Sequence, residues 1–154
     1  MKILVISNMY PSPDAPHYGI FVKNIIEELQ NRGIKIDKIV CYKKNNKISK
    51  LISYFTFYLK ILIKGFFRRY DCIYAHYASH TALPLLILLK LKPYLKIVMN
   101  VHGNDIVPED QRDEKYIPLV RKILSRSCYI ISPSKYFEKV LRNEYNIDKS
   151  KIFV

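Results

Sequence analysis

The chain has 154 residues and a mass of 18.3 kDa, enough for one domain with a sheet covered by helices on both faces. Hydrophobic residues make up 49% and charged residues 25%, which argues against a disordered chain and against a membrane-embedded fold. The net charge is +13, and the acid-free stretches 38–70 and 72–104 carry most of it, which favours an anionic partner.

Six short runs rich in Ile, Val and Tyr predict strands. They cover residues 2–7, 35–41, 72–76, 96–101, 128–132 and 151–154. Several runs are apolar at successive positions, which indicates burial on both faces of a parallel sheet between two helix layers. We therefore predict an α/β fold with a doubly wound, mostly parallel, Rossmann-like sheet, and a single domain over residues 1–154.

Helix-like segments separate these strands. They cover residues 18–32, 47–69, 81–91, 112–126 and 133–145. In the first, apolar residues from Phe21 to Leu29 share one face, and Gly33 is its stop signal. In the third, we place Pro84 in the first turn, where proline is tolerated. The fourth begins with acidic and ends with basic residues, as the helix dipole favours.

The second helix-like segment carries a basic stripe at helical spacing, with aromatic and aliphatic residues around most of the remainder. The stripe consists of Lys47, Lys50, Ser53, Lys60, Lys64 and Arg68. One interpretation is a core helix whose apolar arc packs on the sheet while its lysines face water. The other is a helix that lies on an anionic membrane surface. The sequence leaves both open.

Neither a signal peptide nor a transmembrane helix is predicted. The first residues, MKILVISNMYPSP, hold a run of only four apolar residues, too few for a signal peptide. Lysines interrupt the apolar window 51–67, and the window 82–91 is too short to span a bilayer. We expect a cytoplasmic protein, associated at most peripherally with the inner face of the cell membrane.

Polar clusters follow four of the predicted strands. NMYPSPDAPHYG follows the first, AHYASH the third, NVHGND the fourth and SPS the fifth. Ligands of parallel sheets gather at the carboxyl ends of the strands, so these clusters should share one crevice. The first loop lacks GxGxxG, which argues against a dinucleotide site. Gly19 either lets the backbone approach a phosphate or simply makes a turn.

The histidines are ambiguous by themselves. His102 is suited to donate a hydrogen bond, to act as a general base or to cap the strand end. Together with Asp105, it would reach a polyhydroxylated ligand or make a structural contact within the loop. His76 and His80 straddle a strand end, so helical metal-ligand spacing does not apply to them, and no metal site is expected.

Several functional classes lack their motifs. GxSxG, Walker, HExxH and paired-cysteine patterns are all missing from the sequence. The three cysteines (Cys41, Cys72 and Cys128) are far apart and flanked by strand-like residues, which favours buried thiols in a reducing compartment. Hydrolase and NTPase functions are unsupported, and no cofactor is predicted.

Four segments in succession resemble the amino-terminal half of GT-B retaining glycosyltransferases of family 4. They are NMYPSPDAPHYGIFVKNIIEELQNRGIKI, YDCIYAHYASH, KIVMNVHGNDI and YIISPSKYFEKVL. The resemblance covers essentially the whole chain and implies an acceptor-side domain. It implies that Gly19 lies near the donor diphosphate, and that His102, followed by Gly103, lines the reaction site beside the transferred sugar. It also implies acceptor or sugar contacts for His76 and Asp105.

The chain departs from the family pattern at two points. Many relatives carry a GG pair where this chain has Tyr18–Gly19, and the family continues beyond KIFV into a donor-binding domain with an E-x7-E motif. We therefore expect negligible activity from this chain alone, whether it is part of a longer chain or a single-domain subunit. The implied partners are a nucleotide-sugar donor, bound mainly by the second domain, a glycan or lipid-linked acceptor, and an anionic membrane surface.

The leading expectation is the acceptor-side domain of a retaining glycosyltransferase that serves a cell-surface polysaccharide or glycolipid. Two alternatives are a basic module that binds polyanions or nucleic acid, and a non-catalytic subunit of a two-chain glycosyltransferase. The basic stretch 38–70 motivates the first alternative, but its aromatic residues have core-like spacing and no RRM, KH or helix-turn-helix pattern is present. Nucleic acid is therefore not expected as a partner.

Overall fold

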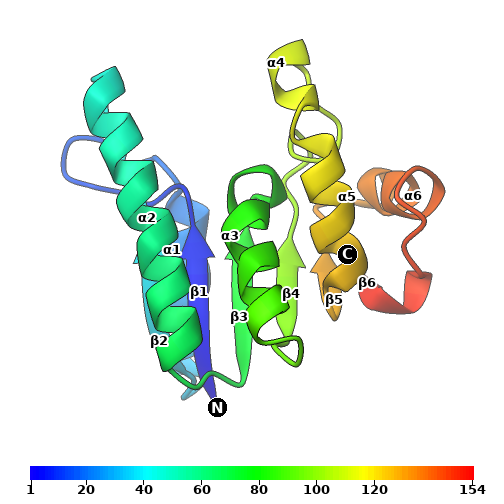
Figure 1. The fold of residues 1–154 in the computed structure, drawn as a ribbon, viewed down its shortest axis with the longest axis horizontal. Helices are drawn as coiled ribbons and strands as arrows, with labels where there is room; N and C mark the ends of the chain where they lie inside the picture. The colour runs from blue at the N-terminus through cyan, green and yellow to red at the C-terminus, as the bar shows by residue number, and fades with distance from the viewer.

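The computed structural model describes residues 1–154, the side chain at position 112 excepted. Over this range six parallel strands form one sheet in the order β2-β1-β3-β4-β5-β6 (Figure 1). The strands are β1 (Lys2–Ser7), β2 (Lys35–Val40), β3 (Cys72–His76), β4 (Ile97–Asn100), β5 (Tyr129–Ile131) and β6 (Ile152–Phe153). The helices are α1 (Ile20–Asn31), α2 (Lys47–Phe67), α3 (Ala78–Leu91), α4 (Gln111–Glu114), α5 (Ile117–Arg126) and α6 (Lys135–Asn143), with a 3-10 turn at Lys149–Lys151. The predicted doubly wound α/β fold is confirmed.

Strand β1 shows why the sheet is covered on both faces. Successive side chains of a strand point to opposite faces, so an apolar run needs two cores. Ile3 and Val5 pack in the core that α1 covers, whereas Leu4 and Ile6 pack in the larger core on the other face. In Figure 1, α2, α3 and α5 lie in front of the sheet and α1 lies behind it. The strand order reverses between β1 and β3, and the carboxyl ends of the strands at such a reversal are where open parallel sheets usually bind ligands.

Burial agrees with the prediction for the first helix and only partly for the cysteines. Val22 and Ile26 of α1 are buried, and Gly33 follows the helix with a φ of 79°. Among the described residues all three cysteines are free thiols. Cys41 is buried as predicted, but Cys72 and Cys128 are only half-buried, because Cys72 begins β3 and Cys128 directly precedes β5, both near the amino edge of the sheet.

The predicted helix over residues 112–126 is wrong as a single element. The structure has two helices there, α4 and α5, and the break falls after Glu114. Pro118 lies in the first turn of α5. A proline lacks the backbone N–H and its ring clashes with the carbonyl four residues earlier, which here belongs to Glu114. The dipole pattern of charges therefore spans two helices and not one.

Helix α3 begins three residues before the predicted start at residue 81. Pro84 consequently lies in the helix interior and not in its first turn. The extra turn is stabilised from outside the segment, because the carboxylate of Asp105 accepts the backbone N–H of Ala78 at 2.8 Å. An acceptor from a distant loop supplies the cap that the local sequence lacks.

Helix α2 has two apolar faces. Phe57, Ile61 and Gly65 are buried against the core, in agreement with the core-helix interpretation. A second row of large apolar side chains, spaced three and four residues apart, is 39–72% exposed. This outer face consists of Ile48, Leu51, Ile52, Phe55, Leu59, Ile63 and Phe66. The core interpretation therefore explains only part of the apolar arc. In the described chain, no helix combines the length and apolar character needed to cross a membrane.

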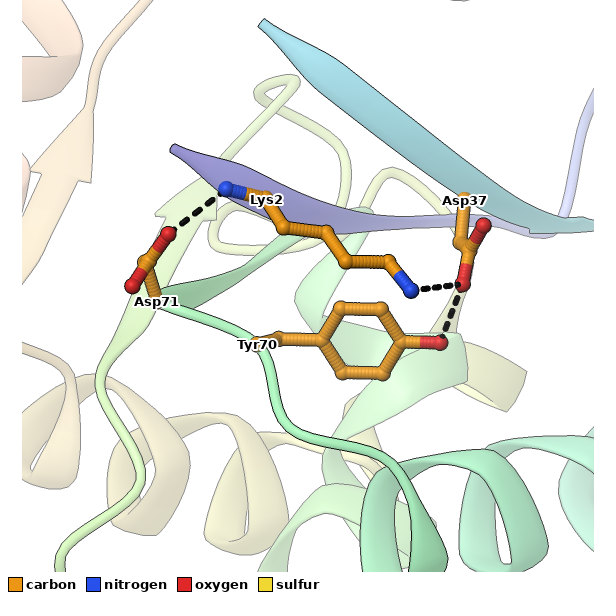
Figure 2. A network of polar contacts seen from close by, with 4 residues as sticks. All are labelled: Lys2, Asp37, Tyr70 and Asp71. Carbon is orange, nitrogen blue, oxygen red and sulfur yellow. Dashed lines mark hydrogen bonds and ion pairs between the residues drawn. The ribbon is translucent and has the colours of Figure 1, made fainter.

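A polar network ties the strands together at the amino edge of the sheet (Figure 2). Lys2 Nζ lies 3.2 Å from Asp37 Oδ2, and the Tyr70 hydroxyl donates to the same oxygen at 2.6 Å. The backbone N–H of Lys2 donates to Asp71 at 2.6 Å. The hydrogen bond from Tyr70 is the main reason why the pKa of Asp37 is lowered. This network joins β1, β2 and the segment before β3 at the edge opposite the candidate site.

Candidate functional site

Four aromatic rings gather at the carboxyl edge of the sheet. Phe21 comes from the start of α1, His76 ends β3, Tyr77 follows it, and His102 lies just after β4. The His102 ring stacks on Tyr77 with a centroid distance of 4.1 Å and lies 4.9 Å from the ring of Phe21. The structure therefore brings His102 to the same edge as Gly19, which directly precedes α1.

His76 and His102 form a hydrogen-bonded pair. The His76 Nδ1 and His102 Nε2 atoms lie 3.2 Å apart. His76 is fully buried, and among the described residues its Nε2 has no hydrogen-bond partner. Burial, reinforced by the neighbouring His102, lowers the pKa of His76 to about 3. Burial lowers the pKa of His102 to about 4. Both imidazoles are therefore neutral at pH 7.

The unpaired nitrogen assigns the proton positions in this pair. A neutral imidazole carries one N–H and one bare nitrogen. A buried N–H without an acceptor is rarer than a bare acceptor without a donor, so we place the His76 proton on Nδ1, from which it donates to His102 Nε2. The proton of neutral His102 then resides on its Nδ1. His102 thus carries a hydrogen-bond donor and no positive charge.

Asp105 holds the loop after β4 in place. The side chain is only 3% exposed, and its two oxygens accept the backbone N–H groups of His102 and Ala78, each at 2.8 Å. Burial raises the pKa of Asp105, while the backbone N–H groups that it accepts act in the opposite direction. Because the side chain is almost completely buried, a ligand would contact this carboxylate only if the loop moved. His76 is equally enclosed, so His102 is the more accessible member of the predicted set.

Both predicted glycines have structural reasons to be glycine. Gly19 has a φ of 72°, and a Cβ there would lie 2.7 Å from the carbonyl carbon of Met9. Gly103 has a φ of 91°, and a Cβ there would lie 2.7 Å from Cζ of Phe137. The turn and the close approach of another segment therefore require glycine at each position, with or without a bound ligand.

Tyr77 is the residue that sequence reasoning missed. It adopts a φ of 58°, which is uncommon for a side-chain-bearing residue, and its ring covers His102. Backbone strain of this kind costs about 1–3 kcal/mol and concentrates at functional sites. The position of Tyr77 in AHYASH, directly after β3, could have marked it as a site residue, whereas nothing in the sequence predicts its positive φ.

Comparisons with known proteins show the family and the fold of this chain. Residues 18–154 match the family model described as Glycosyltransferase Family 4. The chain belongs to glycosyltransferase family 4. A solved structure similar to this family 4 domain is the UDP-GlcNAc 2-epimerase from Methanocaldococcus jannaschii, with a TM-score of 0.64 and 18% identity. The match covers 100% of this chain and 45% of the epimerase, and at this identity it shows the fold alone. A search of curated proteins gave no match.

The described part of this family 4 domain contains no cluster of metal-binding side chains. Among the described residues, no group of three His, Cys, Asp or Glu side chains is arranged to hold a metal ion. The arrangement does offer a neutral hydrogen-bond donor, His102, stacked against aromatic rings at the carboxyl edge of the sheet. Such a surface suits an uncharged polyhydroxylated group, because ring faces contact C–H groups while the imidazole N–H binds a hydroxyl.

Acid is expected to destabilise this family 4 domain through His76. The unfolded chain binds a proton near pH 6.5 and the folded chain only near pH 3, so stability is complete above pH 6.5 and is lost as the pH falls below it. Between pH 7 and pH 5 we expect a loss of about 2 kcal/mol from His76. Urea unfolding at the two pH values, with His76→Phe for comparison, measures this difference.

The exposed His17 supplies the control for this experiment. His17→Ala should keep the full pH dependence, whereas His76→Phe should lose about 2 kcal/mol of it, whatever its stability at pH 7. An equal pH dependence in His76→Phe and the unmodified chain would contradict the burial of a neutral His76.

Proposed function

We propose that this domain is the acceptor-side half of a retaining glycosyltransferase, which moves a sugar from a nucleotide-sugar to a cell-surface polysaccharide or glycolipid. The observation that carries the proposal is the neutral His102 donor at the carboxyl edge of a family 4 domain. The structurally similar epimerase acts on UDP-GlcNAc, itself a nucleotide-sugar, which supports this class of donor.

His102 suits the chemistry of such a transfer. Cleavage of the bond between the anomeric carbon and the diphosphate leaves positive charge on the sugar ring and negative charge on the leaving group. A histidine whose pKa is about 4 stays neutral at pH 7, so it does not repel the oxocarbenium-like ring. Its Nδ1–H donates to a hydroxyl of the transferred sugar and holds the ring for reaction.

The remaining residues of the site support His102 in this proposal. Gly19 is the residue that directly precedes α1, and the positive end of the helix dipole there favours the donor diphosphate. Gly103 lets the loop turn tightly beside the sugar. We assign His76 and Asp105 positioning roles, because both are enclosed and both hydrogen-bond to His102. His76 contacts the imidazole of His102, and the carboxylate of Asp105 accepts the backbone N–H of His102.

A transfer assay tests this function. We expect this chain alone to release no nucleoside diphosphate above background from UDP- or GDP-sugars, because the diphosphate is bound mainly by the donor-binding half. The same domain together with its donor-binding half, in one chain or as a second subunit, should transfer sugar with retention at the anomeric carbon. Turnover by this chain alone would contradict the division of labour, and no transfer by the two halves together would contradict the function.

We further propose that the outer face of α2 rests on an anionic membrane at the cytoplasmic side. Its apolar side chains run along the entire helix, and at about 100° per residue Lys47 and Lys60 fall on its opposite borders. Exposed apolar residues also continue onto α3 through Leu83, Ile87 and Leu91. An apolar stripe bordered by lysines binds an interface through both acyl contacts and anionic headgroups.

Vesicle sedimentation tests the membrane contact. Binding to vesicles with 30% phosphatidylserine should weaken by at least about tenfold in Leu59→Ser/Ile63→Ser, because two side chains of the outer face lose their acyl contacts. Tyr136→Ser, which alters an exposed aromatic residue on α6, should bind like the unmodified chain. Equal binding of both variants, or binding to DNA that responds to salt as strongly as vesicle binding does, would contradict the membrane proposal.

A further inference from the structure

A basic pocket lies at the amino edge of the sheet, at the opposite end of the strands from His102. It has a volume of about 600 Å³ and is formed by the links from α2 to β3 and from α3 to β4, together with the first residue of β1. Among the described residues that line this amino-edge pocket, Asp71 is the one carboxylate. Five lining side chains are cationic: Lys2, Arg68, Arg69, Lys92 and Lys96.

Contacts within the fold account for three of these five cations. Lys2 Nζ lies 3.2 Å from Asp37 Oδ2, as Figure 2 shows. Lys92 Nζ donates to a carbonyl oxygen in the last turn of α2. Arg68 directly follows α2, where the negative end of the helix dipole favours a cation. These three positions need no ligand to explain them.

Arg69 and Lys96 have no such explanation. Both are exposed, and among the described residues neither side chain has an ion pair or a hydrogen bond. Asp71 does not pair with them, and its Oδ2 accepts the backbone N–H of Lys2 at 2.6 Å. Like charges repel, so five cations around one pocket cost free energy that the contacts of the fold do not require. An anion from outside the chain would relieve this repulsion.

The lining of the amino-edge pocket favours phosphate groups as that anion. A guanidinium binds phosphate oxygens through two parallel N–H groups, and an ammonium adds a compact charge with further donors. The pocket is larger than one phosphate needs and falls within the range of small-molecule sites. A chain of adjacent phosphates inside it can contact both links at once, whereas a flat anionic surface meets only the rim of a recess.

We propose that the amino-edge pocket binds a soluble oligophosphate, such as a diphosphate or triphosphate group. Arg69, on the link before β3, and Lys96, on the link before β4, bind the phosphate oxygens, and Arg68 and Lys92 add positive charge. The proposal does not depend on the proposed sugar transfer, because the residues of this pocket lie at the amino edge of the sheet and His102 at the carboxyl edge.

Titration of this chain with inorganic triphosphate tests the proposal, followed by calorimetry and amide NMR at about 0.15 M salt, where exposed charges are screened. Triphosphate should bind at least about tenfold more tightly than inorganic phosphate, because it contacts both links at once. Amide signals of residues 68–71 and 92–96 should shift. Arg69→Gln/Lys96→Gln should weaken triphosphate binding by at least about tenfold, with an unchanged urea midpoint, because neither side chain has a contact that stabilises the fold.

Lys122→Gln/Lys139→Gln is the matched control, because it removes two exposed lysines from α5 and α6, outside the pocket. It lowers the net charge equally and should keep the triphosphate affinity within about twofold. Equal losses in the two double variants, equal affinities for triphosphate and inorganic phosphate, or signal shifts confined to other regions would overturn the proposal. A lower urea midpoint in Arg69→Gln/Lys96→Gln would show that these cations stabilise the fold, and would overturn it as well.

Vesicles with 30% phosphatidylserine distinguish a soluble ligand from a lipid headgroup. Arg69→Gln/Lys96→Gln should bind them as the control variant does, because the proposed membrane contact is made by the outer face of α2. A larger loss of vesicle binding in Arg69→Gln/Lys96→Gln than in the control would assign these cations to membrane headgroups and overturn the proposal of a soluble ligand.

Discussion

Replacing His102 by alanine in the proposed two-half enzyme is expected to lower kcat by about 100-fold with little change in KM. Removing one preorganised hydrogen-bond donor from a reaction centre typically has an effect of this size. If the Nδ1–H of His102 strengthens its contact as charge develops on the sugar, the loss appears in kcat and not in substrate binding. Steady-state kinetics with saturating acceptor measures the two parameters separately.

The choice of substituent tests the assigned proton position. The Asn amide nitrogen overlies the imidazole Nδ1, whereas the Gln amide nitrogen overlies Nε2, so His102→Asn should retain more activity than His102→Gln. Tyr136→Ser, which alters an exposed side chain on α6 away from the site, provides the control and should leave kcat unchanged. Activity in His102→Ala equal to that of the unmodified enzyme would remove His102 from the site, and a better His102→Gln would reverse the proton assignment.

Replacing Asp105 by alanine is expected to lower the free energy of unfolding by about 3–5 kcal/mol. The substitution strips acceptors from two backbone N–H groups, on His102 and Ala78, and each unsatisfied buried donor costs about 1–3 kcal/mol. It also leaves a cavity where a fully enclosed side chain was. Most domains have a total free energy of unfolding of only about 5–15 kcal/mol, so this variant should be close to unfolding at room temperature.

Urea unfolding at pH 7.5 measures this loss, and two further variants interpret it. Glu109→Ala changes an exposed carboxylate in the same loop and should cost less than about 0.5 kcal/mol. Asp105→Asn keeps one acceptor oxygen but turns an amide donor toward a backbone N–H, so an intermediate loss is expected. A loss below about 1 kcal/mol in Asp105→Ala would show that the loop and α3 are held by other contacts.

Local patterns predicted most of the secondary structure. The strand limits agree to within one or two residues, because runs of buried Ile and Val are encoded in consecutive positions. The helix errors have local and distant causes. The break before α5 follows from Pro118, which the sequence displays, whereas the early start of α3 follows from Asp105, which lies 27 residues away from Ala78.

The candidate site divides in the same way. The loops at its edge were predictable, because parallel strands bring their carboxyl ends together and the sequence places polar clusters there. The contacts between residues within the site were not predictable. The sequence gives no indication that Tyr77 has a positive φ, that His76 pairs with His102, or that both oxygens of Asp105 are occupied by backbone groups.

The sequence by itself determined a doubly wound parallel sheet, a family 4 resemblance and one edge rich in polar residues, since side-chain period and strand direction are local properties. Only the tertiary structure decided which of those residues are enclosed and which face the crevice, and it alone separated the apolar arc of α2 into an inner and an outer face. The physical reason is that burial and hydrogen-bond partners depend on the register between segments far apart in the chain, such as His76 and Asn100 on neighbouring strands.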